Sequence, residues 1–245
     1  MSGAAALPNV FAAIDTPDLE AAKRLAATLQ DAGCGIKLGL EFFSAHGGAG
    51  VAAVMAAASG APLFLDLKFH DIPNTVAGAI RAVVPLRPAI VNVHAAGGPA
   101  MMRAAVAAAS EAAATHGVAR PRVLAVTVLT SMDDADLSAV GQTPPAESQV
   151  VRLAQLSQSC GMDGVVCSAR EIGPIRAACG GEFALVVPGI RPAGSAQGDQ
   201  KRVMTPADAM AAGATSLVVG RPITTADDPL AAARAIVAEA AAGAA

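Results

Sequence analysis

The chain has 245 residues, a formal net charge of −3 at pH 7 and 53% hydrophobic residues, with neither Trp nor Tyr. The missing aromatic residues argue against stacking platforms for single-stranded nucleic acid, and the lack of a Lys/Arg cluster argues against binding to a phosphate backbone. The four cysteines have no zinc-binding spacing, and the first residues lack the basic and long apolar segments of a signal peptide. We therefore expect a cytoplasmic protein that binds neither nucleic acid nor a membrane.

Short runs of apolar and β-branched residues alternate with alanine-rich stretches along the chain. The runs predicted as strands span residues 9–15, 35–40, 62–69, 89–94, 122–129, 164–169, 183–189 and 215–221. The stretches with helical spacing span residues 17–33, 75–86, 99–117, 147–161, 207–213 and 228–243. Apolar strands separated by helices predict a parallel sheet covered on both faces. Eight such strands favour an α/β fold of one domain over residues 1–245, a closed (β/α)₈ TIM barrel, rather than an open doubly wound sheet.

Polar residues gather where the predicted strands end, although the strands themselves are apolar. In a TIM barrel the loops at the C-terminal ends of the strands build the active site. The polar and turn residues at these ends are, in chain order, Asp15, Lys37, Asp66, Lys68, His94, Thr130, Ser131, Ser168, Pro188, Gly189, Gly220 and Arg221. We therefore predict that the active site lies at this rim of the barrel.

The loops after the seventh and eighth predicted strands carry glycines and arginines. Barrels often bind phosphate with these two loops, through backbone N–H groups and charged side chains. Arg191 and Gln200 lie in the first loop, and Gly220 and Arg221 lie in the second. One arginine alone would be interpreted as an ordinary surface residue. An arginine and a glycine in each of the two expected loops favour a phosphate site.

The segment FLDLKFHDIPNTV, residues 64–76, places charges in an apolar strand. Residues two apart in a strand share a face, so Asp66 and Lys68 are expected side by side, with Asp71 just beyond them. Together with Lys37 they form an alternating array of carboxylates and ammonium groups, in which the carboxylates favour a protonated Lys68. A lysine held as a cation can stabilise a carbanion and then donate a proton, which suits the loss of CO₂. The alternative is a structural salt-bridge network at the end of a strand.

The same segment resembles the signature of the orotidine 5′-phosphate decarboxylase family, D-x-K-x-x-D-I-x-x-T, which is intact from Asp66 to Thr75. Five further segments also match the family and occur in the expected order along the chain. They are AAID and IKLGLEFF before the signature, and VTVLTSM, VVPGIRP with GDQKRVMTP, and VVGRPI after it. The resemblance implies decarboxylation of orotidine 5′-monophosphate to uridine 5′-monophosphate in pyrimidine biosynthesis. It also implies a homodimeric barrel that uses no metal and no organic cofactor.

The resemblance further implies a role for each residue of the site. Lys68 would protonate C6 and Asp66 would lie beside the departing carboxylate, and with Lys37 and Asp71 they make up the catalytic set. Asp71 and Thr75 would reach into the active site of the partner subunit. The implied substrate contacts are Asp15 and Lys37 at the ribose, Thr130 and Ser131 at the pyrimidine, Pro188 in the same binding set, and Arg191, Gln200, Gly220 and Arg221 at the phosphate.

Two other functions are compatible with a barrel of this pattern. A sugar-phosphate enzyme with a similar motif, such as a 3-keto-gulonate-phosphate decarboxylase or a hexulose-phosphate synthase, would use Mg²⁺ and an enediolate. The positive charges of Lys37 and Lys68 disfavour a cation at the rim, where Mg²⁺ would need several oxygen ligands. A non-catalytic barrel would bind the nucleotide without turnover. For His70 and His94, also near the rim, we favour packing or hydrogen bonding over catalysis.

Overall fold

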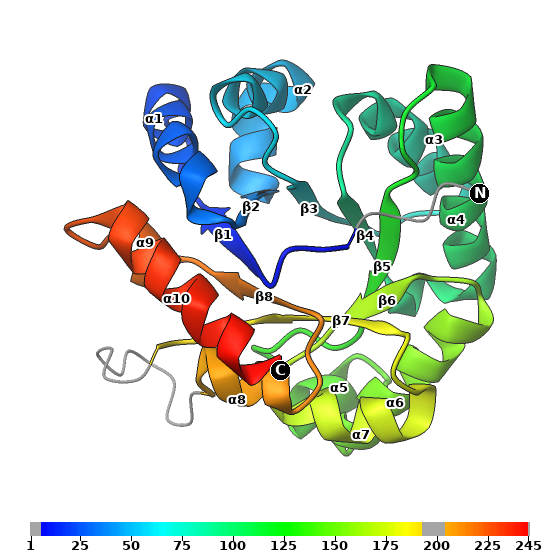
Figure 1. The fold of residues 1–245 in the computed structure, drawn as a ribbon. Helices are drawn as coiled ribbons and strands as arrows, with labels where there is room; N and C mark the ends of the chain where they lie inside the picture. The colour runs from blue at the N-terminus through cyan, green and yellow to red at the C-terminus, as the bar shows by residue number, and fades with distance from the viewer. Residues whose placement is uncertain (1–5, 193–203, 245) are drawn as a thin grey trace.

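The described part of the computed structural model, residues 6–192 and 204–244, contains a closed barrel of eight parallel strands in sequential order (Figure 1). The strands are β1 (Val10–Ile14), β2 (Gly35–Gly39), β3 (Leu63–Phe69), β4 (Ile90–His94), β5 (Arg122–Val126), β6 (Gly164–Val166), β7 (Ala184–Pro188) and β8 (Ser216–Val219). Each strand pairs in parallel with the next, and β8 closes the ring on β1. The predicted TIM barrel is therefore confirmed.

Helices follow the strands and form the outer layer of the barrel (Figure 1). Within the described residues they are α1 (Leu19–Leu29), α2 (Leu40–Ala57), α3 (Pro73–Val83), α4 (Gly98–His116), α5 (Asp134–Ala139), α6 (Ala146–Ser159), α7 (Ile172–Cys179), α8 (Pro206–Ala211), α9 (Arg221–Thr224) and α10 (Pro229–Gly243). The sequence pattern did not predict α2, α5, α7 and α9. Glycines interrupt the apolar spacing of α2, and the other three helices are short.

Helix α2 is the one helix of the described chain that is long and apolar enough, by composition alone, to cross a membrane, with a mean hydropathy of 1.2 over 18 residues. The pattern of charged and polar residues along the chain predicts no such segment. In the structure α2 is broken at Gly47, whose φ of 58° is not helical. Its side chains Phe42, Val51 and Val54 are buried, and α2 packs against α1 and the strands β2 and β3. We therefore describe α2 as part of the outer layer of the barrel.

An apolar layer fills the interior of the barrel and forms a floor beneath the rim. Its members come from strands around the ring and are Phe11, Ala13, Phe64, Ile90, Leu124, Ala184, Val186 and Val218. The rings of Phe11 and Phe64 meet edge to face, with their centroids 5.8 Å apart. A Cβ atom on Gly35 would lie 2.4 Å from the Phe11 ring, so only glycine fits at that point of β2. Side chains two positions apart in a strand point to the same face. Lys37, Asp66 and Asn92 therefore point into the barrel interior as well, two residues nearer the rim along their strands.

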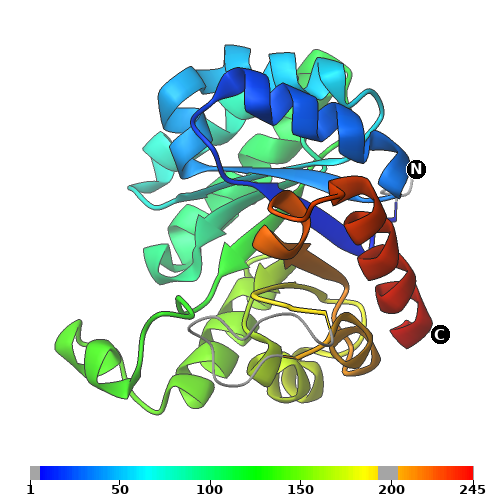
Figure 2. The same ribbon diagram turned by 90° about the vertical axis from the view of Figure 1, so that its left-hand side faces the viewer.

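Strand β5 is shorter than predicted, because it ends at Val126 rather than at residue 129. The backbone N–H and the side-chain hydroxyl of Thr127 both donate to the carbonyl of Val166, at the last residue of β6. Beyond that point Thr130 and Ser131 are exposed and lie in a loop rather than at a strand end. The segment that follows carries α5 and extends away from the barrel (Figure 2).

Candidate active site

Four ionisable side chains from the first three strands form a continuous array at the C-terminal rim. Lys37 Nζ lies 3.2 Å from Asp15 Oδ1 and 3.3 Å from Asp66 Oδ2. The other oxygen of Asp66, Oδ1, lies 2.7 Å from Lys68 Nζ. Lys37 and Asp66 are 7% and 9% exposed, so the centre of the array is buried whereas its outer members face the cavity and solvent. Lys37, Asp66 and Lys68 of the array expected from the sequence thus lie together, whereas its outer end is formed by Asp15, and Asp71 is not part of it.

Asp66 is held as a carboxylate by its neighbours. Burial is the largest single influence and by itself would raise the Asp66 pKa, because the charged form loses its hydration. The ammonium groups of Lys37 and Lys68, together with hydrogen bonds from Lys68 and Asn92, outweigh burial and lower the pKa below its ordinary value. A buried negative charge therefore stands at the centre of the array, and a substrate carboxylate brought beside it would be repelled.

Lys68 has a backbone conformation that few side chains adopt. Its φ is 50°, in the left-handed region, which costs a residue other than glycine on the order of 1–3 kcal/mol. The pairing of β3 with β4 changes register between Leu65 and Phe69, so the ladder is irregular at this point. The backbone N–H of Lys68 donates instead to the side-chain Oδ1 of Asn92, at 2.8 Å. Strain of this kind is concentrated at functional sites.

Sequence reasoning did not single out Asn92, which lies in β4 and is fully buried. Its Nδ2 donates to Asp66 Oδ1 at 2.7 Å, so it contacts the array directly. The available signal was a polar residue inside the apolar run AIVNVH, with the same strand parity as His94. Gly39 was also missed. A Cβ atom there would lie 3.3 Å from Lys37 Nζ and 3.5 Å from Asp15 Oδ1, so glycine leaves room for this ion pair.

The array lines one wall of a cavity of about 340 Å³ at the rim. The other walls bring in residues that the sequence analysis assigned to substrate binding, namely Thr130 from the loop after β5, Pro188 at the end of β7 and Gly220 after β8. The apolar side chains of Phe64, Val126 and Val218 also line it. The cavity therefore combines buried charged groups with apolar side chains.

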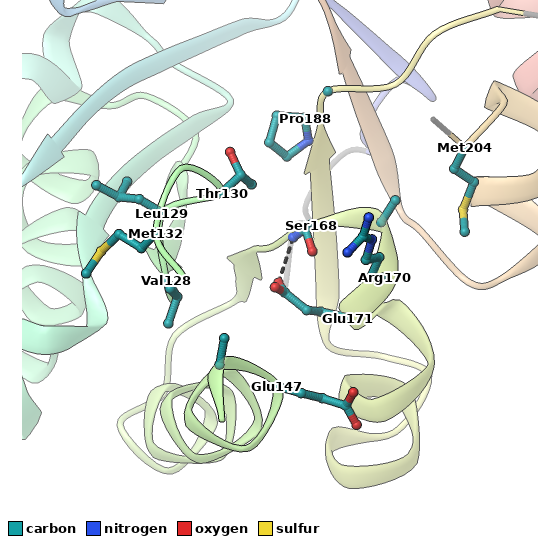
Figure 3. A pocket seen from close by; sticks show the side chains of 13 residues that line it. Val128, Leu129, Thr130, Met132, Glu147, Ser168, Arg170, Glu171, Pro188 and Met204 are labelled. Atoms are coloured by element: carbon teal, nitrogen blue, oxygen red, sulfur yellow. Dashed lines mark hydrogen bonds between the residues drawn. The ribbon is translucent and has the colours of Figure 1, made fainter. Parts of the chain in front are cut away.

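A second cavity, of about 460 Å³, adjoins the first and shares Thr130 and Pro188 with it. Figure 3 shows that Thr130 and Pro188 lie on one side of it and that Arg170, Glu171 and Glu147 lie below. Glu171 is already engaged, since its carboxylate accepts a hydrogen bond from the backbone N–H of Ser168 at 2.7 Å. Although this cavity is the larger, we place the chemistry in the smaller one, because the buried ionisable array lines only the smaller.

The remaining predicted residues lie outside this array. Asp71 is exposed, and its Oδ1 accepts a hydrogen bond from the N–H of Ile72 at 2.6 Å. Thr75 is exposed in the first turn of α3, and Arg221 is exposed as the first residue of α9. Arg191 is partly buried after β7, where its N–H donates to the carbonyl of Met204. Gln200 lies outside the described residues.

His70 and His94 meet beside the array, with their ring centroids 5.4 Å apart and the planes tilted by 36°. Burial lowers the pKa of His94, and the nearby His70 and Lys68 lower it further, against the opposing effect of Asp66. His94 therefore favours its neutral form at the rim. This geometry is compatible with the packing role expected from the sequence.

Comparisons with known proteins establish the family of the chain. Residues 8–236 match the family described as Orotidine 5′-phosphate decarboxylase / HUMPS. The orotidine 5′-phosphate decarboxylase of Rhodospirillum rubrum is 59% identical over 230 residues, which cover 94% of this chain and 93% of the relative. That of Moorella thermoacetica is 55% identical over 232 residues, covering 94% and 91%. The crystal structure of orotidine 5′-phosphate decarboxylase from Lactobacillus acidophilus has a TM-score of 0.84 at 36% identity and covers 96% of this chain and 99% of that chain. The resemblance seen in the signature segment is confirmed, and the chain belongs to the orotidine 5′-phosphate decarboxylase / HUMPS family.

Proposed function

We propose that the protein decarboxylates orotidine 5′-monophosphate to uridine 5′-monophosphate and CO₂, a step of pyrimidine biosynthesis. Its family and the names of its relatives support this reaction. The single structural observation that carries the proposal is the pair of Lys68 Nζ and Asp66 Oδ1, 2.7 Å apart in the rim cavity. A group that can protonate carbon thus lies directly beside a fixed negative charge.

Each partner of this pair has a separate task in the proposed reaction. The carboxylate of Asp66 lies beside the substrate carboxylate, and their repulsion is relieved when CO₂ leaves. The bond from C6 to the carboxylate breaks, and its electron pair stays on C6. The ammonium group of Lys68 stabilises this developing charge and then transfers a proton to form the C6–H bond. The resulting amine regains its proton from solvent before the next turnover.

The test of the function is a direct assay with purified protein. Loss of the absorbance of orotidine 5′-monophosphate is followed in time, and the product is identified as uridine 5′-monophosphate by chromatography. Turnover at catalytic protein concentration is the expected result. Binding of the nucleotide without turnover would instead favour a non-catalytic barrel.

Dialysis against EDTA is expected to leave the decarboxylation rate unchanged. The carboxylates of Asp15 and Asp66 are already paired with Lys37 and Lys68, so these carboxylate oxygens, which Mg²⁺ would need as ligands, face ammonium groups. The rate is measured before dialysis, after dialysis, and after Mg²⁺ is added back. Loss of activity that Mg²⁺ restores would instead favour a metal-dependent sugar-phosphate enzyme with the same barrel fold.

The substrate is held, in this proposal, by the residues assigned from the sequence. Asp15 and Lys37 contact the ribose, and Thr130 and Ser131 contact the pyrimidine. Pro188 belongs to the same binding set, and Arg191, Gln200, Gly220 and Arg221 contact the phosphate. The protein acts as a homodimer in the cytoplasm, with Asp71 and Thr75 entering the site of the partner subunit. Their exposure in the single chain supports this arrangement, because neither side chain is buried by its own barrel.

Replacement Arg221→Ala is expected to weaken the binding of the nucleotide strongly and that of the bare nucleoside hardly at all. A hydrogen bond to a charged group contributes about 1.5–3 kcal/mol, or roughly 10- to 150-fold. KM and kcat are measured for the nucleotide, and inhibition constants are compared for uridine and its 5′-monophosphate. Arg234→Ala, on the exposed face of α10, is the matched control and should change the affinity for neither the nucleotide nor the nucleoside. Equal losses for nucleoside and nucleotide would show that Arg221 does not hold the phosphate.

A further inference from the structure

Asn92, in β4, forms hydrogen bonds with two members of the array, Asp66 and Lys68, which both lie in β3. Its Nδ2 donates to Asp66 Oδ1 at 2.7 Å, and its Oδ1 accepts from the backbone N–H of Lys68 at 2.8 Å. The orientation of the amide follows from chemistry, because a backbone N–H can only donate and a carboxylate can only accept. The side chain is fully buried and uses both of its polar ends on the catalytic pair.

The contact with Lys68 replaces a regular bond of the sheet. The register of β3 against β4 shifts between Leu65 and Phe69, and Lys68 takes a positive φ within this interval. An irregularity of this kind changes the direction of a side chain at the end of a strand. Without Asn92, the N–H of Lys68 would lose the acceptor that it has in this strained conformation, and Asp66 Oδ1 would lose one of its two donors.

We propose that Asn92 is a positioning residue of the decarboxylase, which fixes the Asp66 carboxylate and the Lys68 backbone relative to each other. This inference rests on the proposed function, since it concerns the spacing between the Asp66 carboxylate, beside which CO₂ leaves, and the proton donor Lys68. Asn92 does not contact the reacting atoms in this scheme. It acts through Asp66 and Lys68, so its loss should reduce kcat more than it reduces the binding of the nucleotide.

The charges around Asn92 determine what an acidic replacement would do there. Asp66 and Lys68 face it from β3, Lys37 lies beyond Asp66 on β2, and His94 follows it on β4. On the other side, the β5 residue in register with it is apolar Leu124. A carboxyl group at position 92 would therefore have another carboxylate as its nearest charged neighbour, which raises the pKa of one member of the pair.

The first test is Asn92→Leu, which keeps a similar volume and removes both hydrogen bonds. The expected result is a fall in kcat of about 100-fold, as for a misplacement of about 1 Å, with KM and the affinity for uridine 5′-monophosphate changed much less. Ser216→Ala is the matched control. Ser216 is fully buried at the first residue of β8, at the end away from the rim, and its hydroxyl donates to the backbone carbonyl of Pro8. It should lower the melting temperature without lowering kcat.

The second test is the pH profile of Asn92→Asp. A protonated carboxyl at this position still accepts from the Lys68 N–H and donates to Asp66, whereas the ionised form repels Asp66. The ratio of its kcat to that of the unchanged protein should therefore rise as pH falls from about 8 to 5. If the Asn92→Leu protein does not fold, the pH profile of Asn92→Asp alone tests the positioning role of Asn92.

Two results would overturn the role of Asn92. One is a kcat for Asn92→Leu within about threefold of the unchanged protein, since a displaced catalytic pair should cost far more. The other is a kcat ratio for Asn92→Asp that does not vary with pH. Failure of the proposed function is read separately, because the unchanged protein would then show no turnover of orotidine 5′-monophosphate at any pH.

Discussion

Replacement Lys68→Ala is expected to lower the rate of decarboxylation by about 100-fold or more, the scale of a lost general acid. Binding of uridine 5′-monophosphate should stay within about an order of magnitude, because Lys68 acts on charge that appears only in the transition state. Asp66 keeps its contacts with Lys37 and Asn92 in this variant, so its carboxylate is not left without partners. Single-turnover rates and product affinity, measured on the same preparation, separate the two effects.

The matched control for this experiment is Lys23→Ala on α1. Lys23 also forms an ion pair, at 2.9 Å to Glu20, but the pair lies on the outer surface of the barrel. Exposed pairs contribute little to stability, so this variant should keep both its activity and its fold. A Lys68→Ala protein that retains more than about a tenth of the original rate would contradict a role as proton donor.

Mixing two inactive variants is expected to restore activity if the active site is shared between subunits. Lys68→Ala and Asp71→Asn chains should each be inactive as homodimers. In a mixed dimer, the intact Lys68 of one chain meets the intact Asp71 of the other, so one site is complete and the second carries both changes. Random reassortment makes about half of the dimers mixed, and about a quarter of all sites should recover, as follows from a two-fold symmetric interface.

The measurement is the turnover of orotidine 5′-monophosphate after the two proteins are unfolded and refolded together, compared with each refolded alone. Differential tags confirm that mixed dimers have formed. Two mixtures serve as controls, each containing one variant and an equal amount of the same variant with the other tag, and neither should gain activity. No gain in confirmed mixed dimers would place Asp71 in the site of its own chain.

The sequence was sufficient to predict the barrel, because the alternation of apolar strands with helices is a local property of the chain. Eight strand-like runs correspond to the eight strands, each shortened by one or more residues. It also predicted that three charged residues lie together, since Asp66 and Lys68 share a strand and Lys37 lies on the neighbouring one. Helix α2 was missed because glycines dilute its spacing, and the end of β5 was misplaced because the apolar run continues beyond Val126, where the pairing with β6 stops.

Tertiary structure alone decided how the charged groups are held. Strand alternation predicts that Asp66 and Lys68 are neighbours, but it contains nothing about the positive φ of Lys68. In that conformation the Lys68 N–H donates to Asn92, which is 24 residues away along the chain and comes within 2.8 Å because β4 pairs with β3. Contacts between strands depend on register, which a single sequence does not encode locally. The identity of the charged residues was therefore determined by the sequence, whereas the hydrogen bonds that orient them were determined by the closure of the barrel.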